Sequence, residues 1–373
     1  MSVIVRVGGG KNRLRHRGQD RPVDSDPPSD ADRAVSRLRS SADDGRLRFV
    51  DLFCGIGGFS RAVFDVFPNA VCAGAYDADD GVVSVYSDNY NHPAQTRNVL
   101  TLQASELKGC DLLCAGLPCQ PFSSANKKRR ENAHESYNLA SKVAKLITEA
   151  LPGAVLIEEV PPFLKDEQWT SVLLPALLRA GYTVSAEVLN AAYFGVPQRR
   201  KRAYIFAALQ FSTPLDLRAL SAATEVTVCI SDVVSRPEEV PDAEWLPDDE
   251  WVCCEPITKN GATLVGFLRD AIEKRKNRQD RFYKVYDALG VAPTLTATGS
   301  RLNVAFSVNG KLRARNLRVD ELYAIMGFPR TFIRHTTKTT AKTHAGNAVV
   351  PAVAAAVLRM AAAHGFGKGA EPP

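Results

Sequence analysis

The stretch RFVDLFCGIGGF at residues 48–59 decides the fold of this chain. Its first half, Arg48–Phe53, has the apolar composition of a short buried strand, and Phe59–Phe67 has helical periodicity. The glycines between them suit a tight turn that lets the backbone approach a ligand and presents helix N-terminal amides. Their spacing is GxGG and not GxGxxG, which makes a dinucleotide the less favoured ligand.

Strands and helices continue to alternate as far as Leu209. We predict further strands at Ala70–Asp77, Asp111–Ala115, Ala154–Val160, Tyr182–Leu189 and Arg200–Leu209. Helical patterns lie between them, for example at Leu139–Ala150 and Trp169–Ala180. This order predicts an α/β fold with a doubly wound, mostly parallel sheet, whose ligands bind at the carboxyl ends of the strands.

Changes in composition mark the expected domain boundaries. Residues 1–46 are rich in Arg, Asp, Ser, Gly and Pro and predict a disordered basic tail, because such a segment can bury little apolar surface. Residues 47–209 form the predicted core, and residues 210–292 form a variable region in which the alternation is lost. Residues 293–366 are patterned again and should return to the core before a short tail at 367–373.

The bulk composition predicts a soluble globular protein, and the N-terminal sequence predicts that it stays inside the cell, in the cytoplasm and associated with the nucleoid if the source is prokaryotic. Hydrophobic residues make up 45% of the 373 residues and charged residues 24%. We find no signal-peptide pattern and no apolar run of membrane-spanning length, so we expect no membrane partner. The eight cysteines form neither a regular disulfide framework nor spaced ligand pairs, so we expect no metal. The formal charge of +6 only weakly indicates nucleic acid, since residues 1–48 hold eleven Lys/Arg against seven Asp.

Two candidate site residues stand at predicted strand ends. Asp77 ends the second strand, where a carboxylate commonly hydrogen-bonds ribose hydroxyls. GLPCQPFS at residues 116–123 follows another strand and holds Cys119 between two prolines. Buried packing is the usual role of a cysteine, but Pro-Cys-Gln-Pro is a poor core sequence and favours a reactive thiol.

Charged residues mark two further motifs. LIEEVPP at residues 156–162 ends a strand with Glu158 and Glu159, whose side chains should point to opposite faces. Acidic groups at the end of a buried strand need partners, which favours a functional role. QRRKR at residues 198–202 enters a strand, and alternation places Arg200 and Arg202 on one face. A basic surface run is the alternative for this last motif.

Taken in order, the motifs resemble those of the DNA cytosine-5 methyltransferase family. The similarity covers about Arg48–Leu209 and Ala292–Gly365, and six blocks carry it: DLFCGIGGFS (51–60), GLPCQPFS (116–123), IEEV (157–160), QRRKR (198–202), VDELYAIMGFPRTF (319–332) and GNAVVP (346–351). The resemblance implies a Rossmann-like class I S-adenosylmethionine-dependent methyltransferase domain with a small target-recognition region at 210–292. It also implies methylation of cytosine in double-stranded DNA.

The resemblance implies a role for each matching residue. Cys119 would add to C6 of an extruded cytosine, and Glu158 would bind N3 and the exocyclic amine and protonate N3. Arg200 and Arg202 would steady Glu158, the base and the phosphate. The residues implied to bind S-adenosyl-L-methionine are Phe53, Gly55, Gly57, Asp77, Asn98, Asn347 and Val349.

Two positions depart from the family pattern. Asn98 stands where the family usually has Asp near the cofactor's adenine, and it keeps an acceptor for the adenine amine. Glu159 stands where the family has Asn, which can donate to the nucleophile loop. Glu159 could be protonated and donate as Asn does, be ionised and repel the thiolate, or pair with a basic residue of the 198–202 block. We favour the pairing.

Contacts to DNA are expected from Gln120 and Ser123 and from a basic run in the variable region. The run combines positive charge with aromatic residues, and its cations are Lys274, Arg275, Lys276, Arg278, Arg281 and Lys284. A solvated helix face is the alternative for this run.

Three functions remain open from the sequence. The favoured one is a monomeric DNA methyltransferase, solitary or serving alongside a cognate restriction endonuclease without binding it. The second is a transfer-RNA cytosine-5 methyltransferase, against which the missing Cys-Phe-Thr signature counts. The third is a catalytically silent DNA-binding homologue, suggested by Glu159 and opposed by the presence of Cys119 and Glu158.

Overall fold

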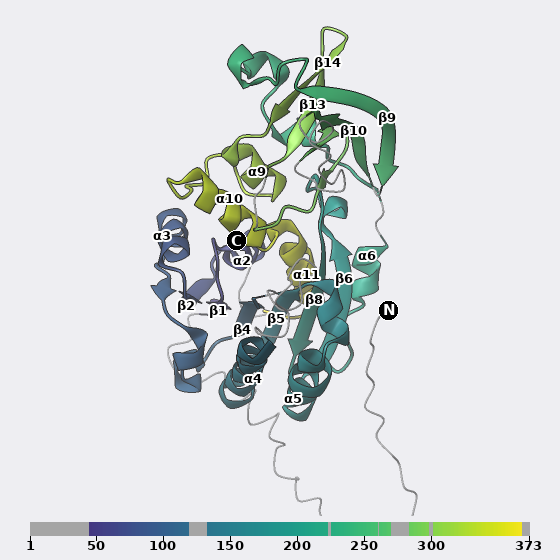
Figure 1. The fold of residues 1–373 in the computed structure, drawn as a ribbon. Coiled ribbons are helices and arrows are strands. Elements are labelled where there is room, and N and C mark those ends of the chain that lie inside the picture. Colours follow the sequence, from purple (N-terminus) through teal and green to yellow (C-terminus); the bar gives the residue numbers. More distant parts are fainter. Residues whose placement is uncertain are drawn as a thin grey trace, which may run out of the picture.

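The computed structural model describes residues 45–118, 133–222, 225–259, 261–269, 283–297 and 301–367 (Figure 1). Two lobes are visible, a larger one that holds the N-terminal strands and a smaller one built around β9 to β14. The predicted tail at 1–46 lies outside the described residues apart from Gly45 and Arg46, and the tail at 367–373 apart from Gly367.

The larger lobe is built on a sheet with the strand order β3-β2-β1-β4-β5-β8-β6. Its strands are β1 (Arg48–Leu52), β2 (Val71–Asp77), β3 (Gln95–Thr96), β4 (Leu112–Gly116), β5 (Ala154–Glu159), β6 (Thr183–Asn190) and β8 (Lys201–Ala208). The strands from β3 to β5 run parallel, and β8 is antiparallel to both of its neighbours. The predicted doubly wound, mostly parallel sheet is therefore confirmed, and the order reverses between β1 and β4.

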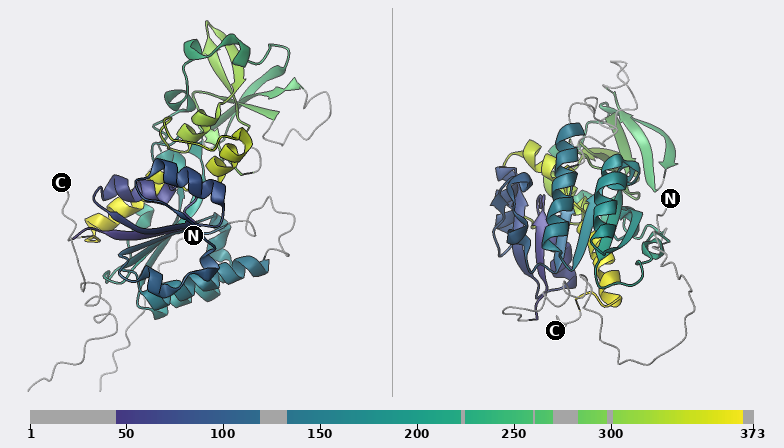
Figure 2. Two further views of the ribbon diagram at one scale, coloured as in Figure 1. Left: turned by 90° about the vertical axis from the view of Figure 1, so that its left-hand side faces the viewer. Right: turned by 90° about the horizontal axis from the view of Figure 1, so that it is seen from below.

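Helices cover both faces of this sheet (Figure 2). Helices α2 (Gly58–Val66), α3 (Asp80–Asn89) and α11 (Pro351–Ala363) lie on one face, and α4 (Ala133–Ala150) and α5 (Leu174–Arg179) on the other. Alternate strand residues serve the two faces: Leu156 packs in the apolar cluster under α2 and α11, and Ile157 packs in the cluster under α4. This alternation places consecutive residues of β5 in two separate cores.

The predicted helix at Trp169–Ala180 is divided in two. A π-helical turn, η4 (Gln168–Leu173), leads into α5, whose second residue is Pro175. Proline has no amide hydrogen to continue the ladder of helical hydrogen bonds, which accounts for a change of geometry just before it. The short helical turns elsewhere are η1 (Val99–Thr101), η2 (Ala104–Leu107), η3 (Pro161–Lys165), η5 (Ala191–Tyr193), η6 (Pro237–Glu239), η7 (Asp242–Glu244), α6 (Leu217–Ser221) and α7 (Ile230–Val233).

The smaller lobe contains a second sheet with the strand order β14-β13-β11-β10-β9. Its strands are β9 (Trp251–Lys259), β10 (Ala262–Leu268), β11 (Lys284–Asp287), β13 (Asn303–Val308) and β14 (Lys311–Asn316). The variable region was expected to end at residue 292, yet β13 and β14 belong to this sheet. The boundary at 292 is therefore corrected to about residue 316, because a strand pattern does not reveal which sheet the strand joins.

The chain crosses between the lobes more than once. A two-residue strand, β12 (Ala292–Pro293), pairs with β7 (Gln198–Arg199) just before β8. After β14 the chain returns to the core through α9 (Val319–Ile325), α10 (Lys338–Asn347) and α11.

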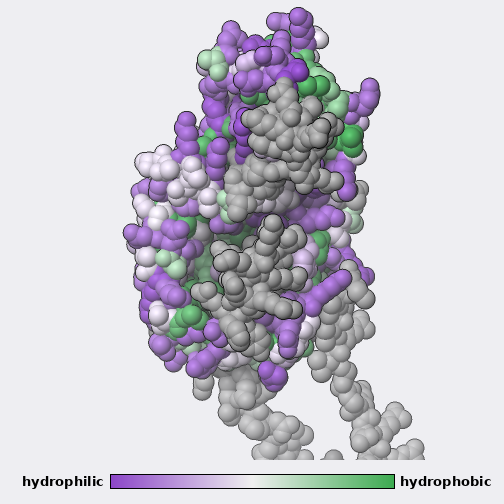
Figure 3. All heavy atoms as spheres, viewed as in Figure 1, coloured by the Kyte–Doolittle hydropathy of each residue, from purple (hydrophilic) through white to green (hydrophobic). Residues whose placement is uncertain are grey.

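Hydrophilic residues predominate on the coloured surface of the face in Figure 3, with apolar residues scattered among them.

Contrary to expectation, one stretch of the chain is long and apolar enough to cross a membrane. It is Lys338–Ala363, which spans α10 and α11. About two thirds (67%) of its most apolar part is buried inside the protein, where α11 packs against α2. This apolar character therefore serves the core.

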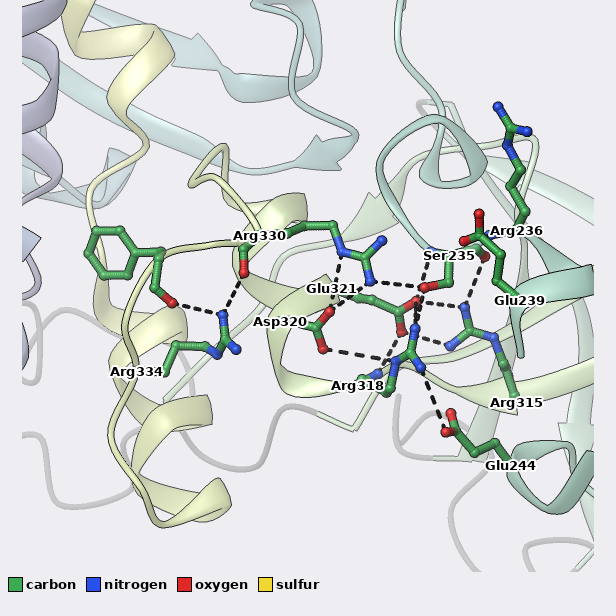
Figure 4. Close-up of polar contacts among 11 residues, drawn as sticks. Ser235, Arg236, Glu239, Glu244, Arg315, Arg318, Asp320, Glu321, Arg330 and Arg334 are labelled. Atoms are coloured by element: carbon green, nitrogen blue, oxygen red, sulfur yellow. Dashed lines mark hydrogen bonds and ion pairs between the residues drawn. The ribbon is translucent and has the colours of Figure 1, made fainter. Parts of the chain in front are cut away.

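A buried ion pair joins β14 to α9 at the junction of the two lobes (Figure 4). The guanidinium of Arg315 donates to both carboxylate oxygens of Glu321, at 2.7 and 2.8 Å, and neither side chain is exposed. Glu321 also accepts from the backbone amides of Arg318 and Ser235. Four donors therefore converge on one carboxylate, tying the second sheet, α9 and the segment after α7 together.

Candidate active site

The glycine-rich turn after β1 has an unusual backbone. Phe53, Gly55 and Gly57 have positive φ angles of 56°, 53° and 87°. A Cβ atom on Gly57 would lie 2.3 Å from the ring of Tyr90, and one on Gly58 would lie 2.3 Å from the carbonyl oxygen of Val349. These two glycines thus allow close packing, Gly57 against Tyr90 and Gly58 against Val349.

Gly55 differs from its neighbours because the space beside it is open. A Cβ atom there would meet nothing closer than 4.0 Å. Its amide donates to the carboxylate of Asp77 at 3.0 Å, and the second oxygen of Asp77 accepts from the amide of Asp79 at 3.1 Å. Asp77 therefore braces the glycine turn, and its oxygens keep lone pairs for a ligand hydroxyl.

Two adjoining pockets open beside Gly55 at the carboxyl ends of the strands. Both are lined by Gly55, Asn347 and Ala348. The first pocket is further lined by Phe53, Cys54, Gly116, Leu117, Glu158, Arg200, Arg202, Gly346 and Val349. The second is lined by Ile56, Asp79, Val82, Thr339, Thr340, Thr343 and His344. The sequence motifs indicated the first set, whereas Asp79 and the residues of α10 that line the second carried no signal that we recognised.

Glu158 and Arg202 form the charged centre of the first pocket. The Nε atom of Arg202 lies 3.2 Å from Oε1 of Glu158, and the two side chains are only 15% and 9% exposed. Glu158 is near the end of β5 and Arg202 near the start of β8, which are adjacent antiparallel strands. Their pairing places a carboxylate at the wall of the pocket beside a positive charge.

Arg200 lies in the same pocket but binds the backbone. Its guanidinium donates to the carbonyl oxygens of Leu295 and Gly346, at 3.0 and 3.1 Å, and of Ala348, at 3.0 Å. The expected ion pair with Glu158 is made by Arg202. Arg200 therefore positions the 346–349 segment that lines both pockets, which the sequence could not indicate because its partners are about 95 to 148 residues away.

Glu159 points to the other face of β5, as alternation requires. It is 1% exposed, and its Oε2 atom accepts from the amide of Val160 at 2.6 Å. Burial raises the pKa of this carboxyl well above its usual value, and the neighbouring charge of Glu158 adds to the rise. Within the described parts of the chain no basic residue pairs with Glu159. The favoured pairing with the 198–202 block is therefore wrong, and a neutral carboxyl is the state that fits.

Asn98 lies at the start of η1, where its Oδ1 atom accepts from the amide of Leu100 at 2.9 Å. Its position as an N-cap explains why a residue with a side-chain oxygen is needed there. Cys54 is the one cysteine among the described residues that line the two pockets of this site, and burial raises the pKa of its thiol well above the usual value. A buried, protonated thiol is a poor nucleophile, so Cys54 serves packing.

Several predicted site residues lie outside the described residues. They are Cys119, Gln120 and Ser123 of the nucleophile motif, and Lys274, Arg275, Lys276, Arg278 and Arg281 of the basic run. Lys284, the last residue of that run, begins β11 and is partly exposed.

Comparison with known proteins decides the family. The family model described as C-5 cytosine-specific DNA methylase matches residues 47–362. The chain belongs to this family. The resemblance seen in the six motifs is thus confirmed, and the activity of the family is DNA cytosine-5 methylation.

Relatives of this methylase are similar over most of their lengths. It is 27% identical over 311 residues to the type II methyltransferase M.HhaI of Haemophilus parahaemolyticus, which spans 82% of this chain and 90% of the relative. It is 26% identical over 317 residues to the type II methyltransferase M.MspI of a Moraxella species, spanning 84% and 69%.

Solved structures confirm the fold of the methylase. The Dnmt2 methyltransferase of S. pombe superposes with a TM-score of 0.67 at 19% identity, covering 86% of this chain and all of that chain. The Entamoeba histolytica methyltransferase EhMeth gives a TM-score of 0.63 at 18% identity, covering 84% and 97%. Methyltransferases of this class use S-adenosylmethionine in general, and DNA is the substrate of the family.

Proposed function

We propose that this methylase holds S-adenosyl-L-methionine in the two adjoining pockets and a cytosine, extruded from duplex DNA, against Glu158. One observation carries the proposal: the Glu158–Arg202 ion pair lies in the same pocket as Gly55 and Asn347. A fixed carboxylate that can recognise a base therefore lies directly beside an open glycine turn that can receive a cofactor.

The residues around Gly55 fit the cofactor. The open space beside Gly55 admits a ligand close to the backbone, and the carboxylates of Asp77 and Asp79 can accept from ribose hydroxyls. Asn347, which is exposed and lines both pockets, can bind the polar end of the ligand. S-adenosylmethionine, when bound, supplies an electrophilic methyl group carried on a positively charged sulfur. Phe53, Val349 and Asn98 complete the set that we assign to this ligand.

The protein's own residues prepare the cytosine. Glu158 accepts from the exocyclic amine and delivers a proton to N3, while Arg202 holds the carboxylate in place. Addition of the Cys119 thiolate to C6 forms a C–S bond, and with N3 protonated the electrons of the ring make C5 nucleophilic. After methylation, loss of the proton from C5 expels the thiolate and restores the aromatic ring. Arg200 acts by positioning the 346–349 segment.

Duplex DNA is the substrate that we favour over transfer RNA, and an active enzyme over a silent homologue. The intact ion pair of Glu158 supports activity, and a neutral Glu159 removes the repulsion that an ionised carboxylate would exert on the thiolate. We infer that the enzyme acts as a monomer inside the cell, where its DNA is. We also infer a role beside a cognate restriction endonuclease, since its relatives are named as type II methyltransferases.

The test is a methylation assay with Cys119→Ser as the control. The wild type should methylate duplex DNA in preference to transfer RNA, and the variant should lose turnover while it binds S-adenosylmethionine as before. Duplex DNA with 5-fluorocytosine at the target should form a denaturant-stable adduct with the wild type alone, because fluorine cannot leave as a proton does. Substantial methylation by Cys119→Ser would refute the covalent mechanism, and a preference for transfer RNA would refute the substrate.

A further inference from the structure

A third hollow opens where the smaller lobe meets the core, and it shares no lining residue with the two pockets of the active site. The charged side chains that line it are two acids and four cations: Glu244, Asp320, Arg318, Arg334, Lys338 and Lys342. Its walls therefore carry an excess of positive charge.

The acids of this hollow are already compensated. Glu244 and Asp320 both pair with Arg318, at 3.7 and 3.9 Å, and Asp320 also pairs with Arg330 at 2.9 Å (Figure 4). Neither acid is within ion-pair distance of Lys338 among the described residues. The charge of Lys338 is therefore not balanced by these acids.

A third cation, in the segment just before β13, adds to the lysines of α10. Burial, and the positive charges of Arg301 and Lys338, lower the pKa of Lys342. Arg301 lies two residues before β13, and its Nε atom donates to Oδ1 of Asn303, the first residue of the strand, at 3.2 Å. Asn303 in turn donates to the backbone carbonyl of Lys284, the last residue of the basic run predicted to contact DNA. Cations from two separate parts of the chain thus converge.

This arrangement violates the local rules for a stable helix. Lys338 and Lys342 are four residues apart on α10, so their like charges face each other. Both lie in the first half of the helix, where positive charge opposes the helix dipole, and its first turn has no acidic residue. Several unfavourable local choices at one place are typical of a functional site.

The cluster lies close to the active site along α10. Asn347, which lines both pockets, ends the helix, and Lys342 and Lys338 are about 8 and 14 Å away along its axis. The segment from Leu295 to Ala297 connects the active site to α10. The carbonyl oxygen of Leu295 accepts a hydrogen bond from Arg200, and that of Ala297 accepts one from the hydroxyl of Thr343. These distances correspond to roughly two to four base steps of a DNA strand.

We propose that Arg301, Lys338 and Lys342 bind backbone phosphates of the DNA duplex next to the base being methylated. The inference rests on the proposed function and deepens it by naming where the duplex is held. Phosphate oxygens would neutralise the cluster, and such contacts position the duplex without reading its sequence.

The experiment compares two variants with the same loss of three positive charges. One is Arg301→Gln, Lys338→Gln, Lys342→Gln. The control is Lys108→Gln, Lys145→Gln, Arg179→Gln, whose exposed cations lie toward the amino ends of the strands. Dissociation constants for duplex DNA are measured across a range of KCl concentrations. The logarithm of the binding constant falls linearly with the logarithm of the salt concentration, and each lost phosphate contact reduces the steepness of this line by about 0.9. The slope of the cluster variant should therefore be less steep than that of the wild type by roughly two to three. At about 0.15 M salt the variant should bind duplex DNA roughly 100-fold more weakly.

The control should keep the slope of the wild type. An unchanged slope in the cluster variant, or equal flattening in both, would overturn the proposal, as would loss of transfer-RNA binding with duplex binding intact. Lys338→Arg, Lys342→Arg should retain the slope because it retains the charge, and single Gln variants serve if the triple variant fails to fold. A wild type that neither binds nor methylates duplex DNA would refute the proposed function, whereas an active wild type with an unaffected cluster variant refutes only this site.

Discussion

Replacing Glu321 with glutamine tests how strongly the buried ion pair at the lobe junction stabilises the protein. Glutamine has nearly the same size but no charge, so it leaves the guanidinium of Arg315 buried without a counter-ion. Both side chains are fully buried, and their N–O distances are 2.7 and 2.8 Å. Removing one member of such a pair costs about 3–5 kcal/mol, because the charge that remains loses its partner and stays out of water.

The hydrogen bonds around Glu321 favour the upper part of that range. The carboxylate also accepts from the amides of Arg318 and Ser235, and bonds to a charged acceptor contribute about 1.5–3 kcal/mol each. The glutamine oxygen keeps part of these, so we expect the free energy of unfolding to fall by ~4 kcal/mol. With a urea dependence of ~3 kcal/mol/M, the unfolding midpoint falls by more than 1 M.

The matched control is Asp320→Asn, one residue earlier. Its ion pair with Arg330 has an N–O distance of 2.9 Å, but Arg330 is 42% exposed, so the loss should be under about 1 kcal/mol. The double variant Arg315→Met, Glu321→Leu removes both charges and should recover the part of the loss that comes from the unpaired guanidinium. The amides of Arg318 and Ser235 still lose their acceptor, so the recovery should be partial. Equal urea midpoints for Glu321→Gln and Asp320→Asn would refute the reasoning.

The pH dependence of the same variant gives a second check. Burial alone would raise the pKa of Glu321, but the hydrogen bonds from Arg315, Arg318 and Ser235 outweigh it and lower the pKa. A lowered pKa stabilises the folded state above the unfolded value of about 4.3, and this stability is lost as the pH falls through the folded value. The difference between wild type and Glu321→Gln should therefore shrink below about pH 4.

Two further substitutions test other parts of the site. The pKa of Glu159 is raised in the folded state, so folding takes up a proton above the unfolded pKa of about 4.3. The stability of the wild type should therefore fall as the pH rises. Glu159→Gln should unfold at a higher urea concentration than the wild type at about pH 8, but not at about pH 4. Lower stability and a slower methylation rate for Glu159→Gln at pH 8 would instead indicate a cation paired with the carboxylate. Gly58→Ala places a Cβ atom 2.3 Å from the carbonyl oxygen of Val349, which must shift. Titration calorimetry should therefore find weaker binding of S-adenosylmethionine. Urea unfolding should show that the free energy of unfolding falls by about 1–3 kcal/mol. Gly109→Ala, where no atom lies within 4 Å, should leave that binding unchanged, and equal affinities in the two variants would contradict the packing role of Gly58.

The sequence by itself determined the strands of the core and their order along the chain. β1, β2, β4, β5, β6 and β8 begin and end within a residue or so of their predicted bounds. Strands of the core sheet are buried on both faces, so each one appears in the sequence as a continuous apolar run. Glycine or charged residues at the carboxyl ends of these runs mark where the backbone meets a ligand. Both signals lie within a few neighbouring residues and can be recognised from the sequence alone. The meeting of Glu158 and Gly55 in one pocket followed, because parallel strands end at the same edge. Arg202 joins them because the antiparallel strand β8 begins at that edge.

Only the tertiary structure decided which partners the polar side chains and later strands found. The patterns of β13 and β14 do not show that they join the second sheet, and Arg200 and Arg202 look equivalent in sequence although one binds carbonyls and the other Glu158. Glu159 remained without the expected cation, and the positive charges of Arg301 and Lys338 act on Lys342 although Arg301 comes from a separate part of the chain. Periodicity reports the burial and direction of a residue, whereas the atom opposite it comes from a segment tens to more than a hundred residues away, which only folding brings into contact.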